Sequence, residues 1–516
     1  MPPQCRREAA VKRYLLAHDL GTSGNKATLF TVDGELLRSA SVPYDTHYFN
    51  NNWAEQNPED WWRAIVESTR AVAENIDPGE IAVIAVSGQM MGCLCVDEAG
   101  KPLRPAILYS DQRAVEECSA LTEAVGAKEL YRITGHRPSA SYSIEKLMWV
   151  RDHEPEIYAR TCKMLHAKDF VNYRLTGVMA SEYSDASGTN AMDLLARRWS
   201  GPILDAAGID KEKLPNLVSS TDVIGELTPT AAREIGLTPG IPVVAGAGDG
   251  VCAAVGVGSV KPGITYNYLG SSSWIATTTV EPIFDDAMRT FVWAHAVPGY
   301  VHPCGTMQTA GSALSWLKNE MGALERAAAR ETGLSPYDLL ARQIEKSPPG
   351  ANGLIFLPYL LGERTPRWNP DAKGALVGLT LEHTRADVLR AVMEGVTLNL
   401  SYILEIFRER IPIREITVIG GGAKGEVWRR IMADVYQAEI LRPNYLEEAT
   451  SMGAAIIGGV GCGAFDTFDV AGRFTKVVDR TLPDPTKASV YARSAQLLND
   501  TYDALKPLFA RFGKQG

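Results

Sequence analysis

One local pattern, a strand followed by a turn of small residues and a second strand, occurs in both halves of the chain. Residues 14–40 place the turn LGTSG and a later Asp-Gly turn between apolar runs, which is typical of an antiparallel meander. Residues 264–279, ITYNYLGSSSWIATTT, repeat the pattern, and residues 415–435 form a strand, a glycine turn and a helix. The repetition predicts two similar α/β lobes that face a central cleft.

The length of the chain also indicates more than one domain. With 516 residues, it exceeds what a single hydrophobic core usually organises. Turn residues concentrate in VGVGSVKPG, which places the boundary near residues 256–263. We therefore expect an N-terminal lobe over 1–256, a C-terminal lobe over 257–485 and a helical segment over 486–516. The sequence does not say on which lobe that last segment packs.

Composition and charge exclude several classes of partner. The net charge of −9 provides no basic surface for nucleic acid or acidic lipid. No stretch approaches the roughly 20 apolar residues of a membrane span, and the apolar run after the basic N-terminus is too short for a signal peptide. The eight cysteines, Cys5 among them, lack the spacing of a disulfide framework or zinc site. These features predict a reduced, cytoplasmic protein that binds neither nucleic acid nor membranes, and they leave a homodimer open.

A carboxylate and a glycine-rich turn follow the first predicted strand. Asp19 ends the strand, and Gly21, Thr22, Ser23 and Gly24 form the turn. Glycines there let backbone N–H groups approach a phosphate, and the hydroxyls add donors. A neighbouring carboxylate would hold the magnesium ion of a nucleotide. A simple hairpin turn, in which the aspartate caps its own backbone, is the alternative that this stretch leaves open.

A second carboxylate, Asp249, stands among small residues in VVAGAGDGVCAAVG, residues 243–256. Gly246, Gly248 and Gly250 surround it, and each costs backbone entropy, which indicates a backbone kept slim for a ligand. We predict that Asp249 is a general base that accepts the proton of an attacking hydroxyl beside a bound phosphate. An N-cap for the helix that begins near Gly250 is the alternative.

The stretch GGGAKG, residues 420–425, matches G-x-G-x-x-G between a strand and a helix, with Glu439 near the place of a ribose ligand. A dinucleotide fold, however, opens with this motif, whereas here it comes late in the chain. A nucleotide platform of another architecture, with the base or ribose against the glycines, is therefore favoured over a nicotinamide dehydrogenase.

Another strand end is a candidate for binding a substrate. SGQMMGC, residues 87–93, places Gln89, Met90 and Met91 after an apolar strand, where ligand clefts form in α/β folds. A buried turn filled by flexible methionine side chains is an equally good interpretation of this stretch alone.

Taken together, these motifs resemble those of the FGGY carbohydrate kinases, and within them most those of the xylulokinases. The resemblance runs from Tyr14 to Phe512. SYSIEKLMWVRDH, residues 141–153, and GALVGLTLEHTRADVLRAVMEG, residues 374–395, fit the two family signatures. LYSDQR, residues 108–113, is similar to the family's Trp-x-Asp-x-Arg stretch. Further matching stretches are DLGTSGNKATLF, AEQNPEDWW, KDFVNYRLTG, FLPYLLGERTPRWNP and IGGGAKGEVWRRIMADV.

The resemblance implies two actin-like, ribonuclease H-like lobes, with a sugar bound deep between them and ATP with Mg²⁺ held mainly on the second. It implies that Asp249 is the catalytic base and that Asp19 acts at the metal. The residues that it assigns to ATP and Mg²⁺ are Asp19, Gly21, Thr22, Ser23, Gly24, Lys26, Gly270, Ser271, Ser272, Gly420, Gly421, Gly422 and Ala423. The residues that it assigns to the sugar are Gln89, Met90, Met91, Asp111, Arg113 and Asp249.

The chain departs from the xylulokinase pattern at three places. Met91 stands where the pattern has histidine, Gly250 where it has asparagine or glutamine, and Gly270 to Ser273 read Gly-Ser-Ser-Ser in place of Gly-Thr-Ser-Gly. The first two positions face the sugar in the family, so the loss of two polar contacts changes substrate preference. We expect an ATP-dependent kinase of a ketopentose or related polyol, D-xylulose first. Ribulose, gluconate, glycerol or a tetritol as substrate, or a non-catalytic sugar sensor, are the alternatives.

Overall fold

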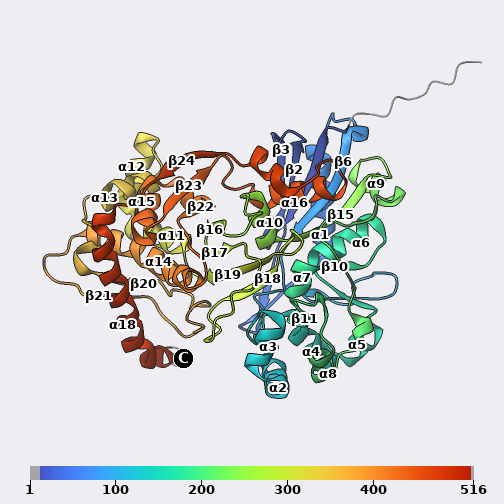
Figure 1. Cartoon of the computed structure of the whole chain (residues 1–516), viewed down its shortest axis with the longest axis horizontal. Helices are drawn as coiled ribbons and strands as arrows, with labels where there is room; N and C mark the ends of the chain where they lie inside the picture. Colours follow the sequence, from blue (N-terminus) through green and yellow to red (C-terminus); the bar gives the residue numbers. More distant parts are fainter. Residues whose placement is uncertain (1–11, 513–516) are drawn as a thin grey trace, which may run out of the picture.

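The structure, a computed structural model, describes residues 12–512. The interpretation of the N-terminal segment, Cys5 included, falls on residues outside this range. Two large mixed sheets lie side by side, the first built from the N-terminal half of the chain and the second from the C-terminal half (Figure 1). Each sheet is the centre of one lobe.

The N-terminal sheet joins a meander to a parallel part. β1, β2 and β3 pair antiparallel in chain order, and β6 and β15 then add parallel to β1 on its other side. The apolar run IAVIAVSG is β6, buried along its whole length. In spatial order the strands are β14 (Val223–Glu226), β15 (Pro242–Gly248), β6 (Ile81–Gly88), β1 (Tyr14–Leu20), β2 (Gly24–Thr31) and β3 (Leu36–Pro43).

The C-terminal sheet repeats this topology. Six of its strands pair in the same order and directions as the six of the first sheet, and β18 extends its edge. The predicted duplication of lobes is therefore confirmed. In spatial order the strands are β18 (Phe291–Ala294), β19 (Val301–Met307), β17 (Ser273–Thr277), β16 (Thr265–Leu269), β22 (Glu415–Ile419), β23 (Glu439–Pro443) and β24 (Val477–Thr481).

Two helices of small residues join the lobes, α10 (Asp249–Gly256) and α16 (Ala449–Gly461) (Figure 1). A Cβ atom added at Gly256 would lie 1.8 Å from the carbonyl oxygen of Ala449, and one at Gly453 would lie 1.8 Å from that of Cys252. Glycine at these positions lets the two backbones touch. Although α16 belongs to the C-terminal half, it also packs on β6 and β1. The boundaries expected near residues 256–263 and 485 stay predictions.

Helices cover both sheets. α1 (Pro58–Val72) packs on β2 and β3, and α6 (Ala167–Thr176) packs on β6 and β15. In the C-terminal lobe, α14 (Arg385–Arg408) packs on α15 (Glu426–Tyr436). The predicted C-terminal helix is α18 (Ala488–Phe512), which contacts α14, α15 and β20 and so packs on the C-terminal lobe.

Shorter elements complete the lobes. The remaining helices are α2 (Val115–Val125), α3 (Ala127–Thr134), α4 (Ser143–His153), α5 (Pro155–Arg160), α7 (Tyr183–Ser187), α8 (Gly201–Ala207), α9 (Pro229–Ile235), α11 (Gly311–Met321), α12 (Ala323–Thr332), α13 (Pro336–Ile344) and α17 (Ala471–Phe474). The remaining strands are β4 (His47–Phe49), β5 (Trp53–Gln56), β7 (Leu94–Val96), β8 (Ala106–Ile107), β9 (Lys163–Leu165), β10 (Ala180–Glu182), β11 (Met192–Asp193), β12 (Arg198–Trp199), β13 (Asn216–Val218), β20 (Ile355–Leu357) and β21 (Ala375–Val377). No helix among residues 12–512 is both long and apolar enough to cross a membrane.

Candidate active site

The two predicted carboxylates lie at one edge of the N-terminal sheet. β1, β6 and β15 run parallel, so their carboxyl ends meet at the same edge. Asp19 of β1 pairs in register with Ser87 of β6, and Ser87 pairs with Ala247 of β15. Asp249 follows two residues later as the first residue of α10. The fold thus brings Asp19 and Asp249 together from positions 230 residues apart in the chain.

Both carboxylates have raised pKa values. Burial, and after it the negative charge of Asp19, raise the pKa of Asp249 to about 7, against the opposing effect of the N–H of Gly250. Burial also raises the pKa of Asp19 to about 6, against the cation of Lys26 and the hydroxyl of Ser87. A carboxylate with a pKa near neutral pH is suited to accept a proton from a hydroxyl group. The sequence interpretation missed Ser87, whose only signal was its place at the end of β6.

Asp249 is not an N-cap. The N-cap of α10 is Gly248, which has no side chain to cap the helix, and Asp249 occupies the first helical position. One oxygen of the Asp249 carboxylate accepts a hydrogen bond of 2.7 Å from the N–H of Gly250. The remaining acceptor positions of the carboxylate are available to a ligand.

The three glycines around Asp249 serve different purposes. Gly246 has a φ of 76°, and its added Cβ would lie 1.9 Å from the carbonyl oxygen of Val86. An added Cβ at Gly248 would lie 2.4 Å from the sulfur of Met90. Only Gly250 faces open space, with no atom within 4 Å of an added Cβ. The interpretation that the backbone stays slim for a ligand is therefore wrong for Gly246 and Gly248, where neighbouring protein atoms require glycine.

The turn between β1 and β2 presents unused backbone donors. Gly21 closes the turn by donating to the carbonyl oxygen of Gly24 at 3.0 Å. The side-chain amide of Gln56 donates to the carbonyl oxygen of Thr22 at 2.6 Å and so holds the turn from outside. Within residues 12–512, the N–H groups of Thr22 and Ser23 donate to no backbone carbonyl. Such free N–H groups are what a phosphate needs.

The corresponding turn of the C-terminal lobe, between β16 and β17, is also closed by a hydrogen bond from its first glycine, but it is shorter by one residue. Gly270 donates to the carbonyl oxygen of Ser272 at 3.0 Å, and Ser271 and Ser272 are exposed. The carbonyl oxygen of Ser271 accepts the N–H of Ala310 at 2.9 Å just before α11. No backbone carbonyl of the described part accepts the N–H groups of Ser271 and Ser272, so this turn is a second candidate cradle for phosphate.

The strand ends of the two lobes face each other. The Tyr266 hydroxyl of β16 donates to the carbonyl oxygen of Gly250 at 2.8 Å. Burial raises the pKa of Tyr268, and the negative charges of Asp19 and Asp249 raise it further. The ammonium of Lys26 donates to the carbonyl oxygen of Glu447 at 2.9 Å. The carboxylates of the first lobe therefore lie opposite the serine-rich turn of the second.

The GGGAKG turn follows β22 on the same side of the C-terminal sheet. Gly420 has a φ of 86° and an added Cβ there would lie 2.7 Å from the carbonyl oxygen of Leu269, while one at Gly422 would lie 2.4 Å from the Leu269 side chain. Gly421 faces open space, and Ala423 is buried. Two of the three glycines thus pack on β16, and Gly421 offers bare backbone to a ligand.

The nicotinamide dehydrogenase hypothesis is wrong. In a dinucleotide fold the glycine motif follows the first strand of a doubly wound sheet. Here it follows β22, the fifth of seven strands along the chain, and the four strands before it pair antiparallel with one another. Glu439, the candidate ribose ligand, forms an ion pair of 2.9 Å with Arg480.

The predicted sugar contacts after β6 are buried side chains with one unused polar atom. Gln89 donates to the amide oxygen of Gln56 at 2.8 Å, and its own amide oxygen has no partner among the described residues. Met90 and Met91 are each 7% exposed, and Lys146 donates to the carbonyl oxygen of Met91 at 2.8 Å. The methionines belong to an apolar cluster that includes Trp293 from the C-terminal lobe. The amide oxygen of Gln89 can accept a hydrogen bond from a sugar hydroxyl, whereas the side chain of Met91 offers only apolar contact.

Asp111 and Arg113, also predicted to contact the sugar, lie inside the N-terminal lobe. Their side chains are fully buried and form an ion pair of 2.8 Å. Arg113 also pairs with Glu55 at 2.8 Å and lies 3.9 Å from the centre of the Trp53 ring. The carboxylate of Asp111 accepts the N–H of Ala54 at 2.6 Å. These contacts explain the pair as support for the turn at residues 108–113, and a contact with the sugar stays a prediction.

The comparisons with known proteins agree with this geometry. The family model of the N-terminal domain of the FGGY carbohydrate kinases matches residues 14–256, and that of the C-terminal domain matches residues 265–462. The chain belongs to the FGGY family of carbohydrate kinases. The expected two-lobed α/β fold is therefore confirmed, and the protein is a carbohydrate kinase. Kinases of this family use ATP, which accords with two turns that offer free N–H groups.

Relatives with two different substrates are similar to this FGGY kinase. A xylulose kinase of Bacillus subtilis is 33% identical over 500 residues, which cover 96% of this chain and 98% of the relative. A gluconokinase of the same organism is 32% identical over 502 residues, covering 95% and 97%. Among solved structures, a gluconate kinase from Lactobacillus acidophilus has a TM-score of 0.91 at 25% identity and covers 98% of this chain and 100% of its own. A xylulose kinase from that organism has a TM-score of 0.90 at 26% identity, covering 97% and 100%.

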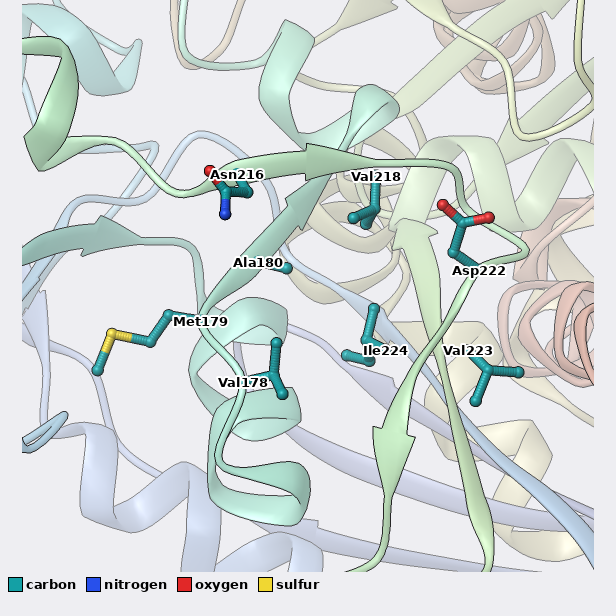
Figure 2. A pocket seen from close by; sticks show the side chains of 8 residues that line it. All are labelled: Val178, Met179, Ala180, Asn216, Val218, Asp222, Val223 and Ile224. Atoms are coloured by element: carbon teal, nitrogen blue, oxygen red, sulfur yellow. The ribbon is translucent and has the colours of Figure 1, made fainter.

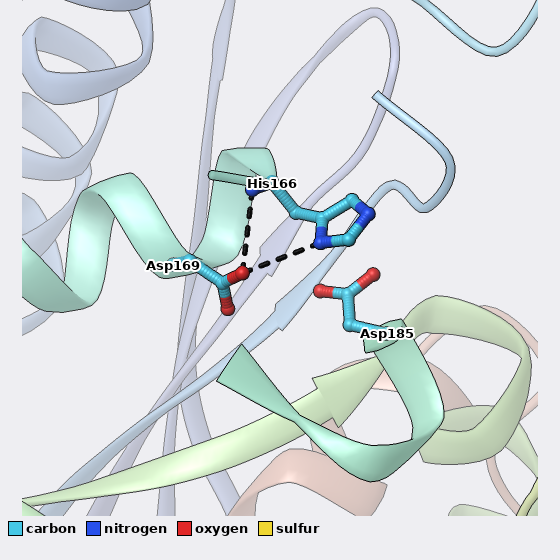
Figure 3. A group of neighbouring side chains, drawn as sticks. All are labelled: His166, Asp169 and Asp185. Carbon is cyan, nitrogen blue, oxygen red and sulfur yellow. Dashed lines mark hydrogen bonds and ion pairs between the residues drawn. The ribbon is translucent and has the colours of Figure 1, made fainter. Parts of the chain in front are cut away.

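A buried cluster of charged side chains lies behind the site, where α6 meets α7. His166, Asp169 and Asp185 point toward one another (Figure 3), with one candidate ligand atom from each within 4.8 Å of the others. The ammonium of Lys168 lies 2.9 Å from a carboxylate oxygen of Asp169 and 3.4 Å from one of Asp185. These carboxylates raise the pKa of Lys168 against the effect of burial. Because this ammonium pairs with both carboxylates, the cluster is a buried salt-bridge network of this FGGY kinase.

A surface hollow lies at the outer edge of the N-terminal sheet, away from these residues. It is bounded by β14, β13 and the segment that leads into β10, and apolar side chains such as Val218 and Ile224 point into it (Figure 2). None of the predicted site residues lines it. The hollow therefore has no part in the candidate active site.

Proposed function

We propose that this FGGY kinase transfers the γ-phosphate of ATP to a hydroxyl of an open-chain ketopentose or related polyol, with D-xylulose as the first candidate and D-xylulose 5-phosphate as its product. The observation that supports the proposal is that Asp249 lies near the two turns with free N–H groups, one between β1 and β2 and the other between β16 and β17. A base, free N–H donors and an open space at Gly250 occur together there. Phosphoryl transfer requires little more than such alignment and charge stabilisation.

In the proposed reaction, Asp249 accepts the proton of the sugar hydroxyl as its oxygen forms a bond to the γ-phosphorus. The bond from that phosphorus to the bridging oxygen of ATP breaks, and ADP leaves. The N–H groups of Thr22, Ser23, Ser271 and Ser272 stabilise the negative charge of the phosphates. Gly420, Gly421, Gly422 and Ala423 are the proposed support for the adenosine.

The residues present also fit the magnesium ion that accompanies ATP. Asp19 is a partly exposed carboxylate at the strand edge, and oxygen is the ligand that Mg²⁺ prefers. When bound, Mg²⁺ neutralises charge on the phosphates. Lys26, paired in register with Asp19, adds a second positive charge. We assign the metal to Asp19 and a phosphate contact to Lys26.

Gluconate is the second candidate substrate. Relatives that are a xylulose kinase and a gluconokinase match this chain with nearly equal identity. Met91 and Gly250 also supply no polar side chain at two positions that face the sugar in xylulokinases. Removal of a hydrogen-bonding partner can change discrimination between substrates by orders of magnitude, so these two positions can favour a sugar other than D-xylulose.

A non-catalytic sugar sensor is the alternative from another class. Such a protein has no use for a proton acceptor, yet the chain places Asp249 and Asp19 together and gives Asp249 a pKa of about 7. This arrangement favours an enzyme.

An ATP-coupled assay over D-xylulose, D- and L-ribulose, L-xylulose, gluconate, glycerol and tetritols tests the proposal. We expect one substrate to give a kcat/KM far above the others, and we expect phosphorus NMR to show a phosphate ester on that sugar. The matched control is Asp249→Asn, which should retain ATP binding without turnover. Absence of phosphate transfer to every compound in the panel would favour the sensor.

A further inference from the structure

The backbone that leads into Asp249 leaves the regular ladder of its sheet. The pairing of β15 with β6 shifts register between Val244 and Ala247. Backbone N–H groups in such an irregular segment need other acceptors, because a buried and unpaired N–H is costly. Ala245 donates to the carbonyl oxygen of Asp222 at 2.9 Å and Gly246 to that of Ser220 at 3.1 Å.

The N–H of Gly248, immediately before Asp249, has a different kind of acceptor. It donates to the side-chain hydroxyl of Ser184 at 2.9 Å. That hydroxyl in turn donates its proton to the carboxylate of Glu182 at 2.6 Å. A hydrogen bond to a carboxylate is strong and fixes the direction of the donor. The proton of Ser184 therefore points to Glu182, and an oxygen lone pair points to Gly248.

Glu182 is the common acceptor for the residues that hold this segment in place. Its carboxylate accepts four hydrogen bonds, from the N–H groups of Ser184 and Asp185 and from the hydroxyls of Ser184 and Ser220. Lys168 lies 3.9 Å away and supplies positive charge. Through Ser184 and Ser220, this one buried carboxylate is connected to the N–H groups of both Gly248 and Gly246. Glu182, at the end of β10, thus stabilises the irregular end of β15 through these hydrogen bonds.

The position of Asp249 depends on these hydrogen bonds. The only hydrogen bond to the Asp249 carboxylate from a described residue is that of Gly250, so no neighbouring side chain orients it. Its location is therefore set by the backbone of residues 248–250. An error of roughly 1 Å in the placement of a reacting group can reduce a rate by roughly 100-fold.

We propose that Glu182 and Ser184 are positioning residues for Asp249, which they hold in place through the N–H of Gly248. The proposal rests on the function proposed above, in which Asp249 is the base. Neither residue touches the substrate. Their effect is on the rate of the chemical step and not on the binding of sugar or ATP.

The test is Ser184→Ala, with Thr189→Val as its matched control. Thr189 is also fully buried, donates its hydroxyl to the carbonyl oxygen of Ala186 at 2.6 Å and accepts the N–H of Ala191 at 3.1 Å. Both variants remove a buried hydroxyl that accepts a backbone N–H, but only Ser184 is connected to β15. We expect Ser184→Ala to lower kcat by about 10- to 100-fold with unchanged KM values, and Thr189→Val to leave kcat close to that of the wild type.

Two further variants keep the outcomes distinct. Glu182→Gln should lower kcat like Ser184→Ala, and if it does not fold, Ser184→Ala decides the question because it leaves the salt-bridge network intact. Equal kcat values for Ser184→Ala and Thr189→Val, at equal thermal midpoints, would overturn the positioning role. If Asp249→Asn itself retains turnover, the proposed function fails first. Loss of turnover in Asp249→Asn with normal turnover in Ser184→Ala rejects only the positioning role.

Discussion

The two sheets share one order and direction of strand pairing but carry different chemistry at the edge where their parallel strands end. In the N-terminal sheet, Asp19 is the last residue but one of β1, and β15 is followed by Asp249. In the C-terminal sheet, β16 is followed by Gly270 and β22 by Gly420. The edge of the N-terminal sheet thus supplies negative charge and a proton acceptor, and the edge of the C-terminal sheet supplies glycine turns with exposed backbone. A fold that places several loops at one edge can change its chemistry without changing its strands.

The glycines sharpen this comparison. Each lobe contains glycines that the protein itself requires, such as Gly246 and Gly420, and a neighbouring glycine that faces open space, Gly250 or Gly421. Only glycines of the second kind are free to serve a ligand. The difference between the lobes therefore lies in a few positions at the turns, and substitutions there separate the roles of the two edges.

The largest effect is expected from Asp249→Asn. Loss of the general base should reduce kcat by roughly 100- to 10,000-fold, while ATP binding measured by calorimetry stays close to normal. The matched change in the other lobe is Ser272→Ala, which retains the backbone N–H groups and should change kcat only slightly. A smaller loss of kcat in Asp249→Asn than in Ser272→Ala would contradict the division of chemistry between the lobes.

In the N-terminal lobe, Gly246→Ala and Gly250→Ala should differ sharply. The added Cβ at Gly246 would lie 1.9 Å from the carbonyl oxygen of Val86 at a φ of 76°, so we expect destabilisation by at least about 2 kcal/mol. Gly250→Ala should keep its stability and change the KM for the sugar. Thermal unfolding and steady-state kinetics measure the two effects. Equal stability of the two variants would argue against the different roles of these glycines.

The same comparison in the C-terminal lobe uses Gly420→Ala and Gly421→Ala. Gly420 has a φ of 86° and a ψ of 174°, a conformation open essentially only to glycine that costs another residue about 1–3 kcal/mol, and the contact with Leu269 adds to this cost. Gly421→Ala should unfold at the wild-type temperature but raise the KM for ATP, without an effect on the KM for the sugar. If Gly421→Ala changed the sugar KM and Gly250→Ala the ATP KM, the assignment of the two edges would be reversed.

The smallest expected effect is on the pKa of Asp249 in Asp19→Asn. Because the negative charge of Asp19 disfavours ionisation of Asp249, its removal should lower the pKa of Asp249 below about 7. Carbon NMR titration of the carboxyl groups in the metal-free protein measures this shift. Ser272→Ala, which removes no charge, should leave that pKa unchanged. An unchanged pKa in Asp19→Asn would mean that the two carboxylates do not interact.

Local patterns of the sequence predicted the elements well. The uninterrupted apolar run IAVIAVSG is β6, and the helical segment expected over residues 486–516 contains α18, which begins at Ala488. The hairpins around residues 21–24 and 270–272 also occur where expected. These features depend on hydrophobic periodicity and on turn residues, which act within a few positions along the chain.

The residues that hold the backbone of the candidate site in place could not be predicted from such local patterns. Gln56 holds the turn after β1, and Ser184 holds the backbone before Asp249, from elements 34 and 64 residues away. Nothing in the local sequence of either residue indicates its partner. The requirement for glycine at Gly246 was visible, but its cause, the carbonyl oxygen of Val86, lies on a neighbouring strand.

The sequence by itself determined the duplicated strand pattern, the residue types at each turn and the FGGY family, because these are properties of short segments read in order. Only the tertiary structure decided which polar groups meet, which glycines serve packing and which face open space, and how a buried carboxylate braces the backbone at Asp249. The reason is that parallel strands bring distant segments to one edge, and burial there sets both the contacts and the proton affinities of the side chains.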